Sequence, residues 1–192
     1  MTIIYFLRHS ITELNEQFLI QGRGDFPLSQ KGAHLAMDYA KAYKDLGLSF
    51  DCVYSSPLKR AYTTAFITVK ELHHKSYIQC SLSLIERDFG AAEGTKINNE
   101  VYDDIINDRI EGIEKTEDFI KRVRKGIDEI VRKNEGKTIL IVTHSHTIKG
   151  FLYTIDNSVL ATSPMRNMSL TKVIYDNREY KIEFMNKLPE EL

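Results

Sequence analysis

The sequence predicts an α/β protein, with helices on both faces of a mostly parallel central sheet in a three-layer α/β/α sandwich. Two observations support this class. The runs 2–7 (TIIYFL) and 138–143 (TILIVT) are apolar enough to be strands buried on both faces, as at the centre of a parallel sheet. Helix-like and strand-like segments also alternate along most of the chain, which is typical of this architecture.

The first predicted strand is followed by a long polar loop and a helix. The loop spans residues 10 to about 28, and a loop of this length is uncommon unless it has a function. The helix is expected to begin near Ser29, because apolar residues recur at helical spacing over 35–46. Gly47 is expected to end it, since glycine readily adopts the left-handed conformation that follows many helices.

The next predicted strand, 50–55, leads directly into a second helix. Ser56 is expected to cap that helix and Pro57 to be its first residue, because these positions favour serine and proline. Apolar residues then recur at helical spacing as far as residue 72.

The second half of the chain continues the alternation. Thr116 is expected to cap a helix that extends to about residue 130, and its acidic first turn suits the helix dipole. The other expected helices span 101–108 and 147–155. The other expected strands span 77–83, 169–175 and 180–185, and the last two form a hairpin.

The bulk composition narrows the class of protein. With 192 residues and no recognisable linker, the chain is expected to be a single domain, 1–192. A net charge of −1 gives no reason to expect nucleic-acid binding. The sequence shows neither a signal peptide nor an apolar stretch of the ~20 residues that cross a membrane, so a cytoplasmic protein is expected. Cys52 and Cys80 have no metal-ligand spacing, and Cys52 is expected to be a reduced, buried thiol.

The residues best suited to chemistry follow the two most apolar strands. His9 comes directly after Arg8 at the end of the first run, and His144 follows the second run. If these strands are neighbours, both histidines lie where open α/β sheets bind ligands, outside the carboxyl ends of the strands. Arginine binds phosphate oxygens with two donors, and a histidine beside it can act as a nucleophile or a base. Nearby positive charge also lowers the pKa of a histidine, which keeps the imidazole neutral at pH 7.

Two further residues suit a phosphate site. Arg60 falls in the first turn of the helix after strand 50–55, where free backbone N–H groups and the helix dipole favour an anion. Glu86 lies in a polar, glycine-containing loop, 86–94, and not on a charged helix face. A carboxyl group in a phosphate site can protonate the leaving oxygen.

Four motifs, in this order, resemble those of the histidine phosphatase superfamily, the phosphoglycerate mutase-like group. They are Arg8-His9, the segment 55–65 (SSPLKRAYTTA), the segment 84–94 (LIERDFGAAEG) and the segment 142–145 (VTHS). Each motif alone is modest evidence of a resemblance, but the four motifs in this order are specific to the family. The resemblance covers the chain from residue 3 to about residue 150. The resemblance implies a phosphoglycerate mutase-like fold and phosphoryl-transfer chemistry.

The resemblance also implies roles for individual residues. His9 would carry the phosphate covalently, Glu86 would donate the proton, and His144 would be a second catalytic histidine that binds the phosphate and the transition state. The residues implied or considered as phosphate or substrate ligands are Arg8, Arg60, Asn15 and Arg23. The family usually has glycine where this chain has Ser10 and Ser145, so the backbone geometry beside the two histidines is an open question.

The function implied is hydrolysis of a small-molecule phosphate monoester through a phosphohistidine on His9, without a metal or other cofactor. One alternative is a phosphoglycerate mutase-type transfer, which the short, acidic segment 95–114 disfavours. A second alternative is a catalytically silent phosphate-binding protein. Only Ser10 and Ser145, which stand where the family usually has glycine, favour it. His144 and His146 have a metal-like spacing, but no obvious further ligands accompany them. The sequence predicts neither the exact substrate nor the oligomeric state.

Overall fold

The computed structural model describes residues 1–75, 77–159 and 161–192. At its centre is a six-stranded sheet with the strand order β3-β2-β4-β1-β5-β6. The strands are β1 Thr2–Arg8, β2 Cys52–Ser55, β3 Ile78–Cys80, β4 Thr138–Thr143, β5 Leu170–Asp176 and β6 Glu179–Lys187. Strands β1 to β4 pair in parallel, whereas β5 pairs antiparallel with both β1 and β6. The α/β class with a mostly parallel sheet is therefore confirmed.

The two apolar runs are neighbouring strands at the centre of this sheet. β1 and β4 pair in register with Arg8 opposite Thr143, so both strands end at the same edge. β3 at the sheet edge is shorter than the expected strand 77–83, because the chain turns into a 3₁₀ helix at Leu82–Leu84. The expected hairpin is present as β5 and β6.

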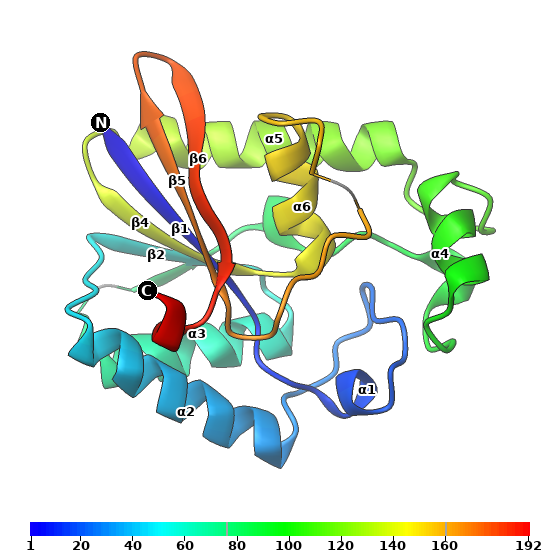
Figure 1. The fold of residues 1–192 in the computed structure, drawn as a ribbon, viewed down its shortest axis with the longest axis horizontal. Helices are drawn as coiled ribbons and strands as arrows, with labels where there is room; N and C mark the ends of the chain where they lie inside the picture. Colours follow the sequence, from blue (N-terminus) through cyan, green and yellow to red (C-terminus); the bar gives the residue numbers. More distant parts are fainter. Residues whose placement is uncertain (76, 160) are drawn as a thin grey trace.

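Helices cover both faces of the sheet (Figure 1). They are α1 Glu13–Glu16, α2 Gln30–Asp45, α3 Lys59–Glu71, α4 Asn99–Ile106, α5 Thr116–Lys133 and α6 Ser145–Tyr153. α2 and α3 lie on one face, and α5 and α6 lie on the other. Side chains of successive strand residues point to opposite faces of the sheet. Phe6 and Ile141 pack into the core beneath α5 and α6, whereas Leu7 and Val142 pack into the core beneath α2 and α3.

Four helices begin at residues other than those expected, and one of them, α4, spans Asn99–Ile106 and not 101–108, because the Asn98 side chain caps it. Ser56 does not cap α3, because Leu58 is the N-cap residue and Lys59 the first helical residue. The Ser56 hydroxyl instead accepts a hydrogen bond from the Leu58 amide and contacts a histidine across the sheet. α5 begins with Thr116 inside the helix and Lys115 at the N-cap, and α6 begins two residues early, directly after β4.

The long loop between β1 and α2 packs tightly against the start of α2. The loop contains α1, which Thr12 caps through its side chain. At Gly32 in the first turn of α2, a Cβ would lie 1.9 Å from the Ile11 carbonyl oxygen. Glycine is therefore required there for the loop to return across the helix.

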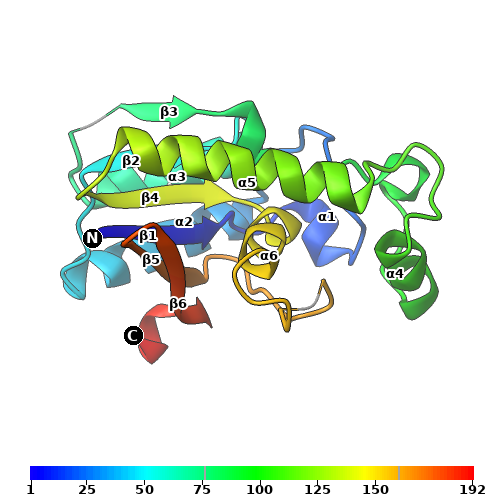
Figure 2. The same ribbon diagram turned by 90° about the horizontal axis from the view of Figure 1, so that it is seen from above.

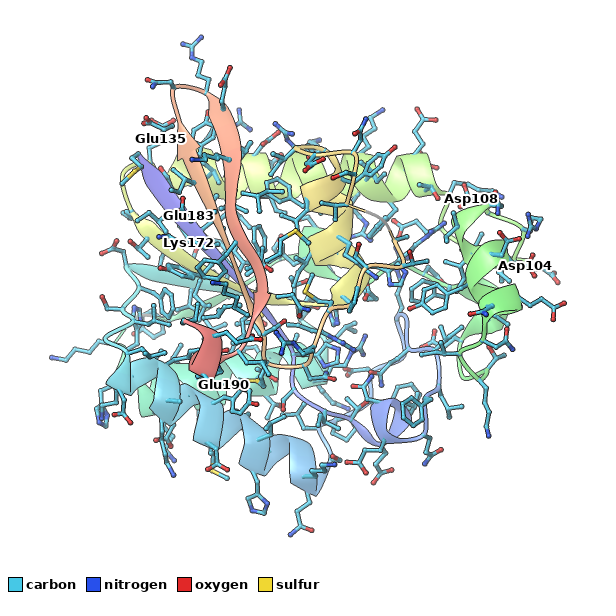
Figure 3. The ribbon with its side chains drawn as sticks, in the orientation of Figure 1. Asp104, Asp108, Glu135, Lys172, Glu183 and Glu190 are labelled. Atoms are coloured by element: carbon cyan, nitrogen blue, oxygen red, sulfur yellow. The ribbon has the colours of Figure 1, made fainter. Side chains whose placement is uncertain are left out.

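α4 lies beyond the end of the sheet toward which β1 and β4 point (Figure 2). It covers a separate small core that includes Ile20, Phe89 and Ile105. Asp104 and Asp108 belong to this outlying part of the molecule (Figure 3), and Asp108 accepts hydrogen bonds from the Thr116 amide and hydroxyl at the start of α5. Among the described residues, no helix is both long and apolar enough to cross a membrane.

Candidate active site

A pocket of about 320 Å³ lies beyond the carboxyl ends of β1 and β4. Arg8 is the last residue of β1, and His9 follows it with its amide bonded to the Thr143 carbonyl of β4 at 2.9 Å. His144 follows β4 directly, and the centroids of the two imidazole rings are 5.2 Å apart. The parallel pairing of β1 and β4 thus places two histidines, distant in sequence, side by side.

His9 is buried, and its Nδ1 atom is hydrogen-bonded to the backbone. Its Nδ1 lies 2.6 Å from the Ser10 carbonyl oxygen, which can only accept, so Nδ1 carries the proton. Burial, together with the nearby charges of Arg60 and Arg8, lowers the pKa of His9 well below its ordinary value. The ring is therefore neutral at pH 7, with the Nε2 lone pair available.

The partly buried Arg8 and the fully buried Arg60 lie close to His9. Arg8 lines the pocket and donates to the Met165 carbonyl, and Arg60 donates to the carbonyls of Gly22 and Gly24 at 2.6 and 2.8 Å. Burial lowers the pKa of Arg60 to about 10, which leaves it charged at neutral pH. Within the described part of the chain, the buried Nε atom of each arginine has no hydrogen-bond partner, so both retain donors for an anion.

His144 is held by a hydroxyl group from the segment before α3. Its Nε2 lies 2.8 Å from the Ser56 Oγ, and both residues are fully buried. Burial and the charge of Arg60 lower the pKa of His144 well below its ordinary value. The Nδ1 atom is buried without a partner in residues 1–75, 77–159 and 161–192. Ser56 thus holds His144 and does not cap α3, although its residue type predicted a helix cap.

Glu86 lines the same pocket and is fixed by the start of α6. Its two carboxyl oxygens accept hydrogen bonds from the backbone amides of His146 and Thr147, each at 3.1 Å, and from the Arg87 amide at 2.9 Å. The Thr147 hydroxyl also lies 3.1 Å from Oε1. These donors fix the position of the carboxyl group in the pocket wall.

Asn15 and Arg23, the remaining candidate ligands of the phosphate, differ in position. Asn15 lines the pocket, although its Oδ1 also accepts from the Thr12 amide at 3.2 Å. Arg23 is not among the lining residues of this pocket, and its side chain is 39% exposed. It forms ion pairs with Asp88 at 3.5 Å and Glu114 at 3.3 Å. The structure therefore brings Asn15 into the site but turns Arg23 toward two carboxylates outside it.

The two serines at positions where the sequence resemblance implies glycine have different environments. Ser10 is fully buried, and its hydroxyl donates to the Gly32 carbonyl at 2.7 Å, away from the pocket. It thereby joins the end of β1 to the start of α2. Ser145 lines the pocket as the first residue of α6.

Several lining residues were not found from sequence. Tyr102 of α4 lies in the segment 95–114, which the resemblance predicted to border the pocket, but neither Tyr102 nor Asn167 before β5 belongs to a motif that singled it out. The Asn167 amide donates to the His9 carbonyl at 2.8 Å. Lys149 could have been found, because it lies one helical turn after Ser145 on the same helix. Among the described residues, no group of three or more His, Cys, Asp or Glu side chains could hold a metal ion.

Known proteins resemble this chain over nearly its full length. Residues 4–188 match the sequence model of the histidine phosphatase superfamily (branch 1). The uncharacterized phosphatase PhoE of Bacillus subtilis is 30% identical over 97% of this chain and 95% of its own length. A broad-specificity phosphatase of Saccharomyces cerevisiae is 31% identical over 78% of this chain and 68% of its own.

Solved structures agree with the sequence relatives. The phosphoglycerate mutase of Bacillus anthracis superimposes with a TM-score of 0.85 at 26% identity, covering 97% of this chain and 93% of that protein. The phosphoserine phosphatase of Entamoeba histolytica shares the fold with a TM-score of 0.84 at 24% identity, covering all of both chains. The expected phosphoglycerate mutase-like fold is confirmed, and the chain belongs to the histidine phosphatase superfamily.

Proposed function

We propose that the chain is a phosphatase that hydrolyses the phosphate monoester of a small metabolite through a phosphohistidine on His9, without a metal ion. One observation carries this proposal. The Ser10 carbonyl holds the proton of His9 on Nδ1, and the ring lies beside Arg8 and Arg60 in a buried pocket. Its free Nε2 lone pair therefore lies in a site that can hold a phosphate dianion.

In the first step, the Nε2 lone pair of His9 forms a bond to phosphorus as the bond from phosphorus to the leaving oxygen breaks. Arg8, Arg60 and His144 bind the other phosphate oxygens and stabilise the charge that develops on them. Glu86 then gives its proton to the leaving oxygen, and the alcohol departs.

In the second step, water attacks the phosphorus of the phosphohistidine. Glu86 accepts the proton of the attacking water, and the nitrogen–phosphorus bond breaks with its electron pair returning to Nε2 of His9. The sum of both steps is a monoester and water going to an alcohol and phosphate. The pocket of about 320 Å³ and the phosphatases among the relatives support a small phosphorylated metabolite as the substrate. A cytoplasmic location stays a prediction.

The test is to trap the covalent intermediate. Rapid acid-free quenching of the protein with a radiolabelled phosphate monoester should leave label that is stable to base and lost in acid, as expected of phosphohistidine. His9→Ala should abolish both the label and turnover, whereas His34→Ala, on the exposed face of α2, should retain both. Labelled protein in the His9→Ala variant, or normal turnover by it, would refute the nucleophile assignment. Absence of both labelling and turnover with a wide panel of monoesters would favour a silent phosphate-binding protein.

A mutase is the second candidate, because a phosphoglycerate mutase is among the similar structures. The segment 95–114 contributes Ile97, Tyr102 and Ile105 to the pocket lining, so it borders the site. We favour hydrolysis because this segment is short. Interconversion of 2- and 3-phosphoglycerate in the presence of the bisphosphate, faster than phosphate release, would establish the mutase instead.

A further inference from the structure

Lys149 is a buried cation of the pocket that the proposed mechanism does not use. Its side chain is almost fully buried, with a relative exposure of 4%, and it lines the pocket together with His146. The two residues are three apart on α6, so they lie on the same face of this helix. α6 therefore contributes a lysine and a histidine to the wall of the pocket that His9 also lines.

The charge of Lys149 has no carboxylate partner. Its Nζ donates to the Ala161 carbonyl and lies 3.4 Å from the Ser163 carbonyl, both of them neutral acceptors. In the described ranges, no Asp or Glu oxygen lies within ion-pair distance of this Nζ. Burial lowers the pKa of Lys149 to about 8, so most of it is still charged at neutral pH. An ammonium has three donors, and two carbonyls leave one of them for a ligand.

His146 adds an unpartnered polar atom beside this lysine. Its Nε2 is buried without a hydrogen-bond partner among the residues that the structure describes, and its side chain is more than nine-tenths buried. The ring packs edge-on against Phe89 and stacks on Tyr102, with centroids 4.9 and 6.2 Å apart. Burial lowers the pKa of His146 well below its ordinary value, so the ring is neutral and can donate one hydrogen bond.

A phosphate bound at His9 leaves Lys149 without an anionic partner of its own. The charges of Arg8 and Arg60 act on His9, where the phosphate is proposed to bind. The hydrogen-bond acceptors of Lys149 are neutral carbonyls, and a buried charge without an anionic partner is costly. A substrate with a negative charge on its leaving group would supply that partner.

We propose that Lys149, with His146 beside it, binds a carboxylate on the leaving group, so that the protein selects phosphorylated hydroxy acids over phosphorylated neutral alcohols. This inference rests on the proposed function, because it takes the phosphate to lie between His9 and the two arginines. The carboxylate accepts hydrogen bonds from the Lys149 ammonium and the His146 ring. Lys149 is then the residue that determines specificity, while the bond-breaking groups remain those already described.

The test compares two substrates that differ in one group. 3-Phosphoglycerate and glycerol 3-phosphate share their phosphate ester and hydroxyl, but the first has a carboxylate where the second has a hydroxymethyl group. The wild-type kcat/KM should be at least about tenfold higher for 3-phosphoglycerate, as expected for a charge-assisted hydrogen bond. Lys149→Met should lower that value by about 10- to 100-fold and change the value for glycerol 3-phosphate by less than about threefold. Lys172→Met removes an ammonium that lies over the Tyr5 ring outside the pocket, and should leave both values unchanged.

A second variant separates charge from loop packing. Lys149→Gln can still donate to a backbone carbonyl but has no charge, so it should lose the preference as Lys149→Met does, whereas Lys149→Arg should retain most of it. Equal losses on both substrates would overturn the proposal, since they would show that Lys149 only holds the loop at Ala161 and Ser163. So would a wild-type protein with no preference between the two substrates.

Binding to the His9→Ala protein distinguishes failure of this inference from failure of the proposed function. Calorimetric titration of that variant with each compound measures the carboxylate preference without turnover. At least about tenfold tighter binding of 3-phosphoglycerate, lost in the His9→Ala/Lys149→Met double variant, supports the subsite even if hydrolysis is absent. Equal affinities for the two compounds would overturn it even if the wild-type protein proves to be a phosphatase.

Discussion

Replacement of Glu86 by glutamine tests the proton donor with a magnitude that follows from the structure. The carboxyl group accepts from three backbone amides, two at Oε1 and one at Oε2. A glutamine amide puts an NH₂ group where one of these oxygens was, so at least one backbone N–H loses its acceptor. A buried donor left unsatisfied costs about 1–3 kcal/mol. At about 2–4 °C per kcal/mol for a domain of this size, the Tm should fall by about 2–12 °C.

The effect on catalysis depends on the leaving group. General acid catalysis contributes about 10²- to 10⁴-fold, so Glu86→Gln should lower kcat/KM for an alkyl phosphate by that factor. 4-Nitrophenolate leaves without a proton, so kcat/KM for its phosphate, which covers only the steps up to departure of the leaving group, should fall by less than about tenfold. Steady-state kinetics at a temperature where both proteins are folded provide the comparison. Glu93→Gln is the matched control, because Glu93 accepts from the Gly24 amide at 2.7 Å but does not line the pocket.

An equal loss of kcat/KM on both substrates would refute the assignment of Glu86 as the proton donor. It would mean that Glu86 acts only by fixing the start of α6, through the amides of His146 and Thr147, and that another group supplies the proton. A large loss on alkyl phosphates with the Tm unchanged would leave the chemical role intact. It would show that the amides found other acceptors.

Three further outcomes are expected. Ser56→Ala removes the hydroxyl that holds His144 at 2.8 Å, and should lower kcat about tenfold with a smaller change in KM, as measured by steady-state kinetics. The free energy of unfolding should fall as the pH is lowered below about 6.5. His9, His144 and His146 have lowered pKa values in the folded protein and ordinary pKa values in the unfolded chain. The unfolded chain therefore binds up to three more protons than the folded protein. The free energy of unfolding should drop by as much as about 4 kcal/mol per pH unit there, and a Tm that is constant from pH 7.5 to 5.5 would contradict this. Gly32→Ala places a methyl group 1.9 Å from a loop carbonyl and should cost about 1–3 kcal/mol in denaturant unfolding, a loss that an unchanged midpoint would disprove.

Helix starts were the least predictable part of the fold. Ser56 and Pro57 have the residue types of a helix start, yet α3 begins at Lys59, and the Ser56 hydroxyl contacts His144, which follows β4. A local pattern contains no information about such a partner. Arg23 shows the same limit in the site: its place in the loop after Asn15 suggested a pocket residue, but Asp88 and Glu114 lie close enough to pair with it.

The sequence by itself determined the central strands, the alternation of helices and strands, and the charged groups of the site. These features depend on apolar periodicity and on ordered motifs, which can be read along the chain. Which polar groups meet depends on the tertiary structure: the Ser10 hydroxyl with the Gly32 carbonyl, Ser56 with His144, the α6 amides with Glu86, and Lys149 with the pocket. These contacts join segments tens of residues apart, and their energies depend on burial and distance, which arise only when the sheet brings the strand ends together.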